Sequence, residues 1–185
     1  GHGPRTAELS VLLGTRLGMN DEQIKLLSYG ARIHDFGRTG IDHGLMNNAG
    51  ALTISERGAM ETHCQLGYDM LKPAKLPAEI VLTILHHHEN YDGSGYPDGL
   101  AGDGIPLAAR LMALADVYDA LSTSRPYRDV LPQEAIEQEL LGEAHRGRLD
   151  AACVTALLAA QAQCREIQRR FPDTENISAP HAPAL

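Results

Sequence analysis

The sequence predicts an all-α fold, and three observations carry that prediction. The 185 residues include no Trp and only two Phe, so the core has to be built from Leu, Ala, Ile, Val and Met. Ala and Leu favour helix. Apolar residues recur three and four positions apart, and no useful stretch alternates as a half-buried strand does. We expect one domain over residues 1–171, followed by a flexible tail over 172–185 that is rich in Pro and polar residues.

The apolar spacing predicts about seven main helices. Asn20 or Asp21 is placed to cap the second, Thr53 with Glu56 forms a capping box for the third, and Asp150 caps the last. Proline suits the first turn of a helix and opens three of the others. The segment 92–104 is rich in Gly, Pro and Asp and predicts a loop. The expected helices run over residues 6–17, 21–35, 53–70, 77–88, 107–123, 132–144 and 150–170.

Charge and cysteine content exclude several classes of protein. The formal net charge of −8 argues against non-specific binding to a DNA or RNA polymer or to anionic lipid. No apolar run approaches the ~20 residues that span a membrane, and no signal peptide opens the sequence, so we expect no membrane partner. The three cysteines cannot all pair within the chain, which fits a reducing, cytoplasmic setting.

The nine histidines are the unusual feature, and most lie in the first half of the chain. Four predicted helices carry a His or Asp that serves no purpose in an apolar core. Taken singly, each has an ordinary explanation: a local cap, a hydrogen-bonded core histidine, a surface histidine pair, or a paired carboxylate. Taken together, they are typical of groups that a helical bundle brings to one point. These residues are His34, Asp35, His63, His87, His88 and Asp116.

Such a set predicts a metal centre. Imidazole suits Fe, Mn, Zn, Ni or Cu, and a carboxylate can bridge two metals. The set is larger than the four ligands of a closed zinc site, so we expect at least two metals with open positions. Asp119 shares a helix face with Asp116 and is expected to orient a ligand histidine or to pair with an arginine. Cys64 is expected to be a buried thiol, and His86 to point away from the ligands.

Several motifs resemble a known family. Residues 34–38 (HDFGR) resemble the HDxGK motif of HD-domain phosphohydrolases. Residues 87–121, which begin HHENYDGSGYPDGL, closely resemble the signature of the HD-GYP family, and 125–128 (RPYR) is similar to its RPYK segment. The resemblance covers about residues 2–160 and implies an HD-domain helical bundle around a multinuclear metal centre.

The resemblance implies a cofactor and a set of ligands. Members hold two or three metals, often iron, and we expect two divalent ions, Fe or Mn. Members with three metals use a glutamate four residues before the histidine that His2 matches; here that position precedes Gly1, so a third site lacks a ligand. Asp35 is expected to bridge the metals. The implied metal ligands are His2, His34, Asp35, His63, His87, His88 and Asp116.

The resemblance also implies a reaction, the hydrolysis of cyclic di-GMP to linear pGpG, and possibly on to GMP, by a metal-bound hydroxide. Two divalent ions with the carboxylates of Asp35 and Asp116 leave a net charge of about +2, which attracts an anionic substrate even in an acidic protein. Asp35 and Arg38 are the expected catalytic residues. The expected substrate contacts are Arg38, Tyr96, Arg125 and Arg128.

One departure keeps an alternative open. Arg38 stands where the motif has lysine; arginine keeps the charge but has a different shape and does not lose its proton. A catalytically weak signalling module that binds cyclic di-GMP or protein partners is therefore the second hypothesis. A hydrolase of another nucleotide, such as a hybrid cyclic dinucleotide, is the third. The expected partners are a cyclic dinucleotide and a regulatory domain or signalling protein.

Overall fold

The computed structural model describes residues 1–46, 50–123 and 130–172. These residues form helices and loops with no β-strand, which confirms the all-α prediction; a single isolated bridge joins Asp92 and Ala101. The helices are α1 (His2–Arg16), α2 (Asp21–Arg32), α3 (His43–Met46), α4 (Ile54–Glu61), α5 (His63–Leu71), α6 (Ala78–His86), α7 (Leu107–Ser122), α8 (Gln133–His145), α9 (Ala151–Leu158) and α10 (Gln161–Arg170). Short 3-10 turns lie at η1 (Phe36–Gly40), η2 (Lys72–Ala74) and η3 (Gly102–Gly104).

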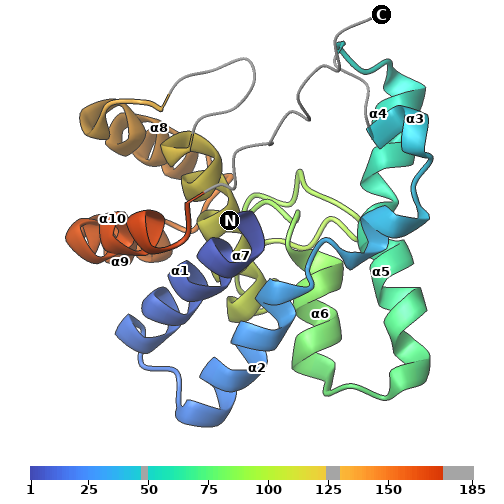
Figure 1. The fold of residues 1–185 in the computed structure, drawn as a ribbon, viewed down its shortest axis with the longest axis horizontal. Coiled ribbons are helices and arrows are strands. Elements are labelled where there is room, and N and C mark those ends of the chain that lie inside the picture. The colour runs from blue at the N-terminus through green and yellow to red at the C-terminus, as the bar shows by residue number, and fades with distance from the viewer. Residues whose placement is uncertain (47–49, 124–129, 173–185) are drawn as a thin grey trace, which may run out of the picture.

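The helices pack in two groups around α1 and α7 (Figure 1). On one side, α2 packs against α1 and α6, and α5 lies beyond α6. On the other side, α8, α9 and α10 cover α7 and α1. The turn η1 lies against α5. This arrangement brings the start of α1, the end of α2 and the end of α6 to the same region of the molecule (Figure 1).

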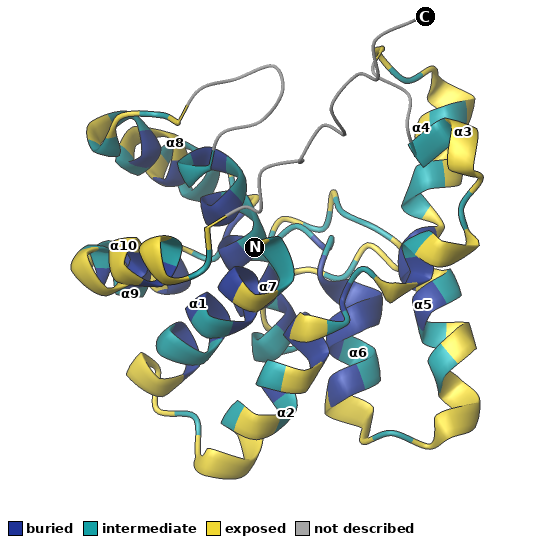
Figure 2. Ribbon diagram, viewed as in Figure 1, coloured by how far each residue is buried: buried dark blue, intermediate teal, exposed yellow. Residues whose placement is uncertain are grey.

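The main apolar core lies between α1, α7 and the three C-terminal helices. Leu9 and Leu13 of α1, Leu111 and Leu114 of α7 and Leu157 of α9 belong to one cluster and are almost wholly buried. Each such leucine contributes about 2 kcal/mol by burial. In Figure 2 the buried surfaces face this interior, whereas α3 and much of α4 are exposed. The core therefore supports the start of α1 and the whole of α7.

The predicted caps are present. Asn20 accepts from the backbone N–H of Gln23 and forms a full capping box, as Thr53 does with Glu56. Asp150 accepts from the backbone N–H groups of the second and third residues of α9. Among the described helices, none is both long and apolar enough to cross a membrane.

Some helix boundaries differ from the prediction. The first helix begins at His2 rather than Thr6, because Pro4 lies in the first turn, where a missing N–H costs nothing. The second ends at Arg32. The side chain of His34 then forms a hydrogen bond through Nδ1 to the carbonyl oxygen of Ala31. Asp35 therefore lies in a turn instead of a helix.

Two predicted long helices are each divided. The one predicted over 53–70 is interrupted at Thr62, whose hydroxyl donates to the carbonyl oxygen of Ala59 at 2.6 Å. The one predicted over 150–170 bends after Leu158, where the N–H of Ala160 donates to the carbonyl oxygen three residues earlier. Both parts of that bend bury residues in the main core. Of the predicted tail over 172–185, all but Pro172 lies outside the described residues.

Candidate metal centre

The structure brings the seven predicted ligands together from five places in the chain. They lie at the start of α1, in the turn after α2, at the start of α5, just after α6 and within α7. Among the described residues, three groups that contain these ligands each place one donor atom per residue within 4.8 Å of the others, and a fourth group, His86–Glu89–Asp98, lies outside the predicted set. The three groups are His34–Asp35–His87, His2–His34–Asp116 and His63–Cys64–His87–His88.

Asp35 lies at the middle of the first group. Its carboxylate is 3.4 Å from Nε2 of His34, 3.5 Å from Nε2 of His63 and 3.9 Å from Nε2 of His87. The oxygen Oδ1, which faces the last two rings, is buried and makes no hydrogen bond. Its close cation among the described residues is the partly exposed guanidinium of Arg38, whose Nε lies 2.8 Å away without forming a hydrogen bond. A buried oxygen facing two imidazoles is thus left to be satisfied by a further cation.

The three imidazoles are oriented alike by the chain around them. In each of His34, His63 and His87, Nδ1 lies 2.7–2.9 Å from the carbonyl oxygen of the residue three positions earlier. A carbonyl only accepts, so Nδ1 donates and carries the proton. In the neutral ring Nε2 is then the lone-pair nitrogen, the one that binds a metal. All three lone pairs therefore point toward Asp35.

The spacing of these lone pairs supports a metal ion. Nε2 of His63 and Nε2 of His87 lie 3.3 Å apart. Because each ring has its proton on Nδ1, no proton is available between the two nitrogens when both rings are neutral, and the lone pairs repel. A cation placed beside them and Oδ1 of Asp35 would remove that repulsion. The donors present therefore fit a divalent transition metal.

The protonation states of His63, His87 and His88 agree with this interpretation, whereas His34 keeps a proton shared with Asp35 that a bound cation would have to displace. Burial lowers the pKa of His63, lowers that of His88 to about 3 and lowers that of His87 well below its ordinary value. These rings are neutral near pH 7, the form that binds metal. Burial also opposes charge on His34 and Asp35, but their mutual hydrogen bond outweighs it: the pKa of His34 is raised and that of Asp35 is lowered.

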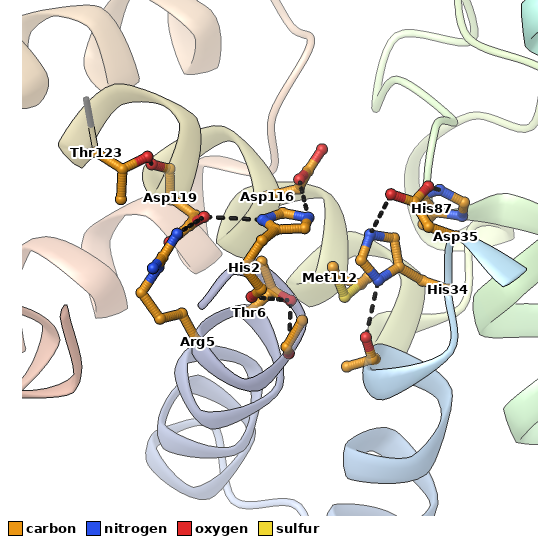
Figure 3. A network of polar contacts seen from close by, with 12 residues as sticks. His2, Arg5, Thr6, His34, Asp35, His87, Met112, Asp116, Asp119 and Thr123 are labelled. Carbon is orange, nitrogen blue, oxygen red and sulfur yellow. Dashed lines mark hydrogen bonds and ion pairs between the residues drawn. The ribbon is translucent and has the colours of Figure 1, made fainter. Parts of the chain in front are cut away.

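His2 and Asp116 form the other side of the cluster (Figure 3). Nε2 of His2 lies 3.4 Å from Oδ1 of Asp116, and Nδ1 of His2 lies 2.8 Å from Oδ2 of Asp119. Asp119 is almost wholly buried and accepts two further hydrogen bonds from Arg5, at 2.5 and 3.1 Å. Asp119 thus contacts both a histidine and an arginine, the two partners that its helix position suggested.

Two predicted substrate residues lie at the open side of the cluster. Arg38 places Nε 2.8 Å from Oδ1 of Asp35 without the alignment of a hydrogen bond, and 41% of its side chain is exposed. The ring of Tyr96 lies 5.0 Å from that of His88 and tilts 31° to it. Arg125 and Arg128, the other two predicted contacts, lie outside the described residues.

One neighbour was expected to be only a buried thiol. Cys64 is fully buried, as predicted, but its sulfur lies 3.6 Å from Nε2 of His63. Burial raises the pKa of this thiol to about 12. Both residues occupy the first turn of α5, where the chain has just left the interruption at Thr62. The sequence carries no signal for that interruption, so the proximity was not predicted. His86 points elsewhere, as expected, and contacts Asp98.

Comparisons with known proteins agree with the fold. Residues 1–153 match the family described as HD domain. The cyclic di-GMP phosphodiesterase response regulator RpfG of Xanthomonas campestris is 40% identical over 170 residues, which cover 90% of this chain and 44% of that protein. The 3'3'-cGAMP-specific phosphodiesterase 2 of Vibrio cholerae is 33% identical over 178 residues, which cover 93% and 33%.

A solved structure has the same fold. An HDG"Y"P protein from Bdellovibrio bacteriovorus superimposes with a TM-score of 0.71 and 23% identity, over 87% of this chain and 51% of that one. The chain spans less than half the length of the two curated relatives. The family match covers most of the described helices and all seven histidine and aspartate residues of the cluster. The chain belongs to the HD domain family, and its predicted HD-GYP relationship is confirmed.

Proposed function

We propose that this chain is a metal-dependent phosphodiesterase that opens cyclic di-GMP to linear pGpG. The observation that carries the proposal is the convergence of Nε2 of His63 and His87 on Oδ1 of Asp35, a buried oxygen that makes no hydrogen bond. This buried set of lone pairs needs cations, and cations at an open site suit attack on a phosphodiester. The names of the curated relatives supply the substrate class.

The proposal assigns two divalent ions, Fe or Mn, to the cluster. His63, His87 and His88, with Asp35, would hold one ion. His2, His34 and Asp116 would contribute to the other, and Asp35 is placed to serve both. Bound there, the metals would supply positive charge to the phosphate oxygens and a coordinated water that ionises near neutral pH.

The protein's own side chains have distinct roles in this proposal. Asp35 holds negative charge at the centre, and the guanidinium of Arg38 beside it remains accessible to a phosphate oxygen. Tyr96 offers a flat ring beside His88 for a base or sugar of the dinucleotide. Arg125 and Arg128 are proposed as further phosphate contacts on the resemblance alone.

Partners and location follow from similar reasoning. Because the chain spans less than half of the curated relatives, we propose that a regulatory domain or a signalling protein accompanies this activity. The three cysteines are unpaired thiols, so we propose a reducing cytoplasm as the compartment.

The test combines metal analysis of anaerobically purified protein with chromatography of the products. We expect about two metals per chain and conversion of cyclic di-GMP to pGpG. Asp35→Asn removes the central charge and should lower turnover by at least ~100-fold together with metal content. Asp69→Asn is the control, because Asp69 is exposed and bonds only to Gln65 in the described contacts.

Three results would contradict parts of the proposal. Full activity of the Asp35→Asn variant would exclude the mechanism. Tight binding of cyclic di-GMP without product after long incubation with Fe(II) or Mn(II) would show a binding module instead. Faster hydrolysis of 3'3'-cGAMP in the same assay would reassign the substrate to the class named for the Vibrio relative.

A further inference from the structure

The loop after α6 is anchored by a buried carboxylate. Glu89 follows the histidine pair directly and is only 4% exposed. Its Oε1 accepts from the backbone N–H of Asp98 at 2.8 Å, and its Oε2 accepts from the backbone N–H of Leu100 at 3.1 Å. Both oxygens therefore hold the far side of the same loop, and hydrogen bonds to a charged acceptor are among the stronger ones.

A second contact holds Asp98 from the other side of the histidine pair. His86 is 6% exposed, and its Nε2 lies 2.9 Å from Oδ2 of Asp98. A carboxylate only accepts, so Nε2 of His86 donates. His86 and Glu89, on either side of the pair, thus both hold Asp98. His86 contacts the side chain of Asp98, and Glu89 contacts its backbone N–H.

The loop between these contacts is pressed against the pair. The backbone N–H of Tyr96 donates to the carbonyl oxygen of His88 at 3.2 Å. Gly95 lies so close that an added Cβ would be 2.2 Å from the backbone nitrogen of Asn90. The Tyr96 ring is held 5.0 Å from the ring of His88. The position of Tyr96 therefore depends on the hydrogen bonds that Glu89 makes to the backbone of the loop.

We propose that Glu89 is a positioning residue, which through the N–H groups of Asp98 and Leu100 holds Tyr96 as one wall of the substrate pocket beside His88. This rests on the proposed function for its kinetic consequence. The loop anchoring itself does not, so it can be measured in protein without substrate.

The sharpest variant is Glu89→Gln, which keeps the shape but replaces one acceptor oxygen with an NH2 donor. One of the two loop N–H groups must then face a donor. Hydrogen exchange should become faster at the amides of Asp98 and Leu100, with metal content unchanged. Glu139→Gln is the matched control, because Glu139 is half-exposed and contacts Arg146 on the surface. Asp98→Ala removes the contact to His86 alone and should give a smaller effect in the same direction.

The kinetic test is a double-mutant cycle with Tyr96→Ala. Glu89→Gln alone should raise KM for cyclic di-GMP and lower kcat/KM by roughly tenfold. In the Tyr96→Ala background it should have no further effect, because the side chain it positions is gone. Unchanged exchange at Asp98 and Leu100, an additive cycle, or loss of metal in parallel with activity would each overturn the proposal. If Glu89→Gln does not fold, the same readouts apply to Glu89→Asp, whose shorter side chain cannot reach both N–H groups.

Discussion

The two sides of the histidine cluster are oriented by different means. On one side, His34, His63 and His87 each donate Nδ1 to a carbonyl three residues earlier in the chain. On the other side, His2 is oriented by Asp119, which lies 117 residues away. We call these the carbonyl-oriented side and the aspartate-oriented side.

The difference teaches where each side is vulnerable. A carbonyl three residues away is in place once the local turn forms. The carbonyl-oriented side therefore needs only that the turns carrying its histidines pack close to one another. The aspartate-oriented side needs α1 and α7 packed together, and it places a buried ion pair between them (Figure 3). Breaking such a pair by removing one partner is strongly destabilising.

The largest effect should come from closing the space between the turns on the carbonyl-oriented side. A Cβ on Gly37 would lie 1.9 Å from the carbonyl oxygen of His63 and 2.5 Å from the backbone nitrogen of Gly67. These are backbone atoms, so Gly37→Ala must separate η1 from α5 and move Asp35 away from His63. We expect a loss of about 3 kcal/mol or more in the free energy of unfolding, measured by urea denaturation, and loss of bound metal.

Gly58→Ala is the control for this change. Gly58 lies in the exposed part of α4, and an added Cβ there meets nothing within 4 Å. Alanine should stabilise that helix by about 0.5–1 kcal/mol. If Gly37→Ala bound metal as well as Gly58→Ala did, the close approach of η1 and α5 would not be what orients the carbonyl-oriented side.

An intermediate effect is expected on the aspartate-oriented side. Asp119→Asn keeps one acceptor oxygen, which cannot serve both His2 and the buried Arg5. We expect roughly 2–3 kcal/mol of destabilisation and metal affinity lower by about 10- to 100-fold, measured by denaturation and by competition with a chelator. Full metal affinity in this variant would mean that His2 is held by something other than Asp119.

The pH dependence gives this prediction a direction. Burial raises the pKa of Asp119, but the hydrogen bonds from His2 and Arg5 outweigh it, and the pKa is lowered from its ordinary value. The stability contributed by the ionised group is therefore fully present above the ordinary carboxyl pKa of 3.8 and is lost as the pH falls through the lowered value. The difference in the free energy of unfolding between wild type and Asp119→Asn should therefore become smaller in acid.

The comparison also explains how far the sequence could predict the structure. The all-α class and the caps at Asn20, Thr53 and Asp150 depend on short-range patterns, and the structure agrees with them. The candidate ligands were also chosen from local patterns, and the structure brings their side chains together. The motif around His34 and Asp35 is likewise local. Such features can be predicted because neighbouring residues determine them.

What could not be predicted depends on contacts between distant residues. Asp119 had two possible partners from its helix position, and only the packing of α1 on α7 selects Arg5 and His2 together. The interruption at Thr62, just before His63 and Cys64, coincides with a side-chain hydroxyl that competes for a backbone carbonyl and has no Gly or Pro to mark it. The hydrogen bonds from Glu89 to the backbone of residues 98–100 likewise could not be predicted, because they span a loop of irregular backbone.

The smallest effect should sharpen how far the aspartate-oriented side extends. Nε2 of Gln168 in α10 donates to Oδ1 of Asp119 at 3.2 Å and to the hydroxyl of Ser122 at 2.8 Å. Gln168→Leu removes both contacts but leaves Asp119 with Arg5 and His2. We therefore expect about 1 kcal/mol of destabilisation and metal affinity within a few-fold of wild type.

Gln163→Leu on the same helix is the matched control, since Gln163 is exposed and its side-chain oxygen accepts a hydrogen bond from Arg16 on the surface. A loss of metal affinity in Gln168→Leu equal to that in Asp119→Asn would show that α10 itself orients His2 through Asp119. The aspartate-oriented side would then include the C-terminal helix, and any partner that moves α10 would act on the metal centre. If Gln168→Leu keeps its metal affinity, His2 is oriented by contacts between α1 and α7 alone, because Arg5 then suffices to fix Asp119.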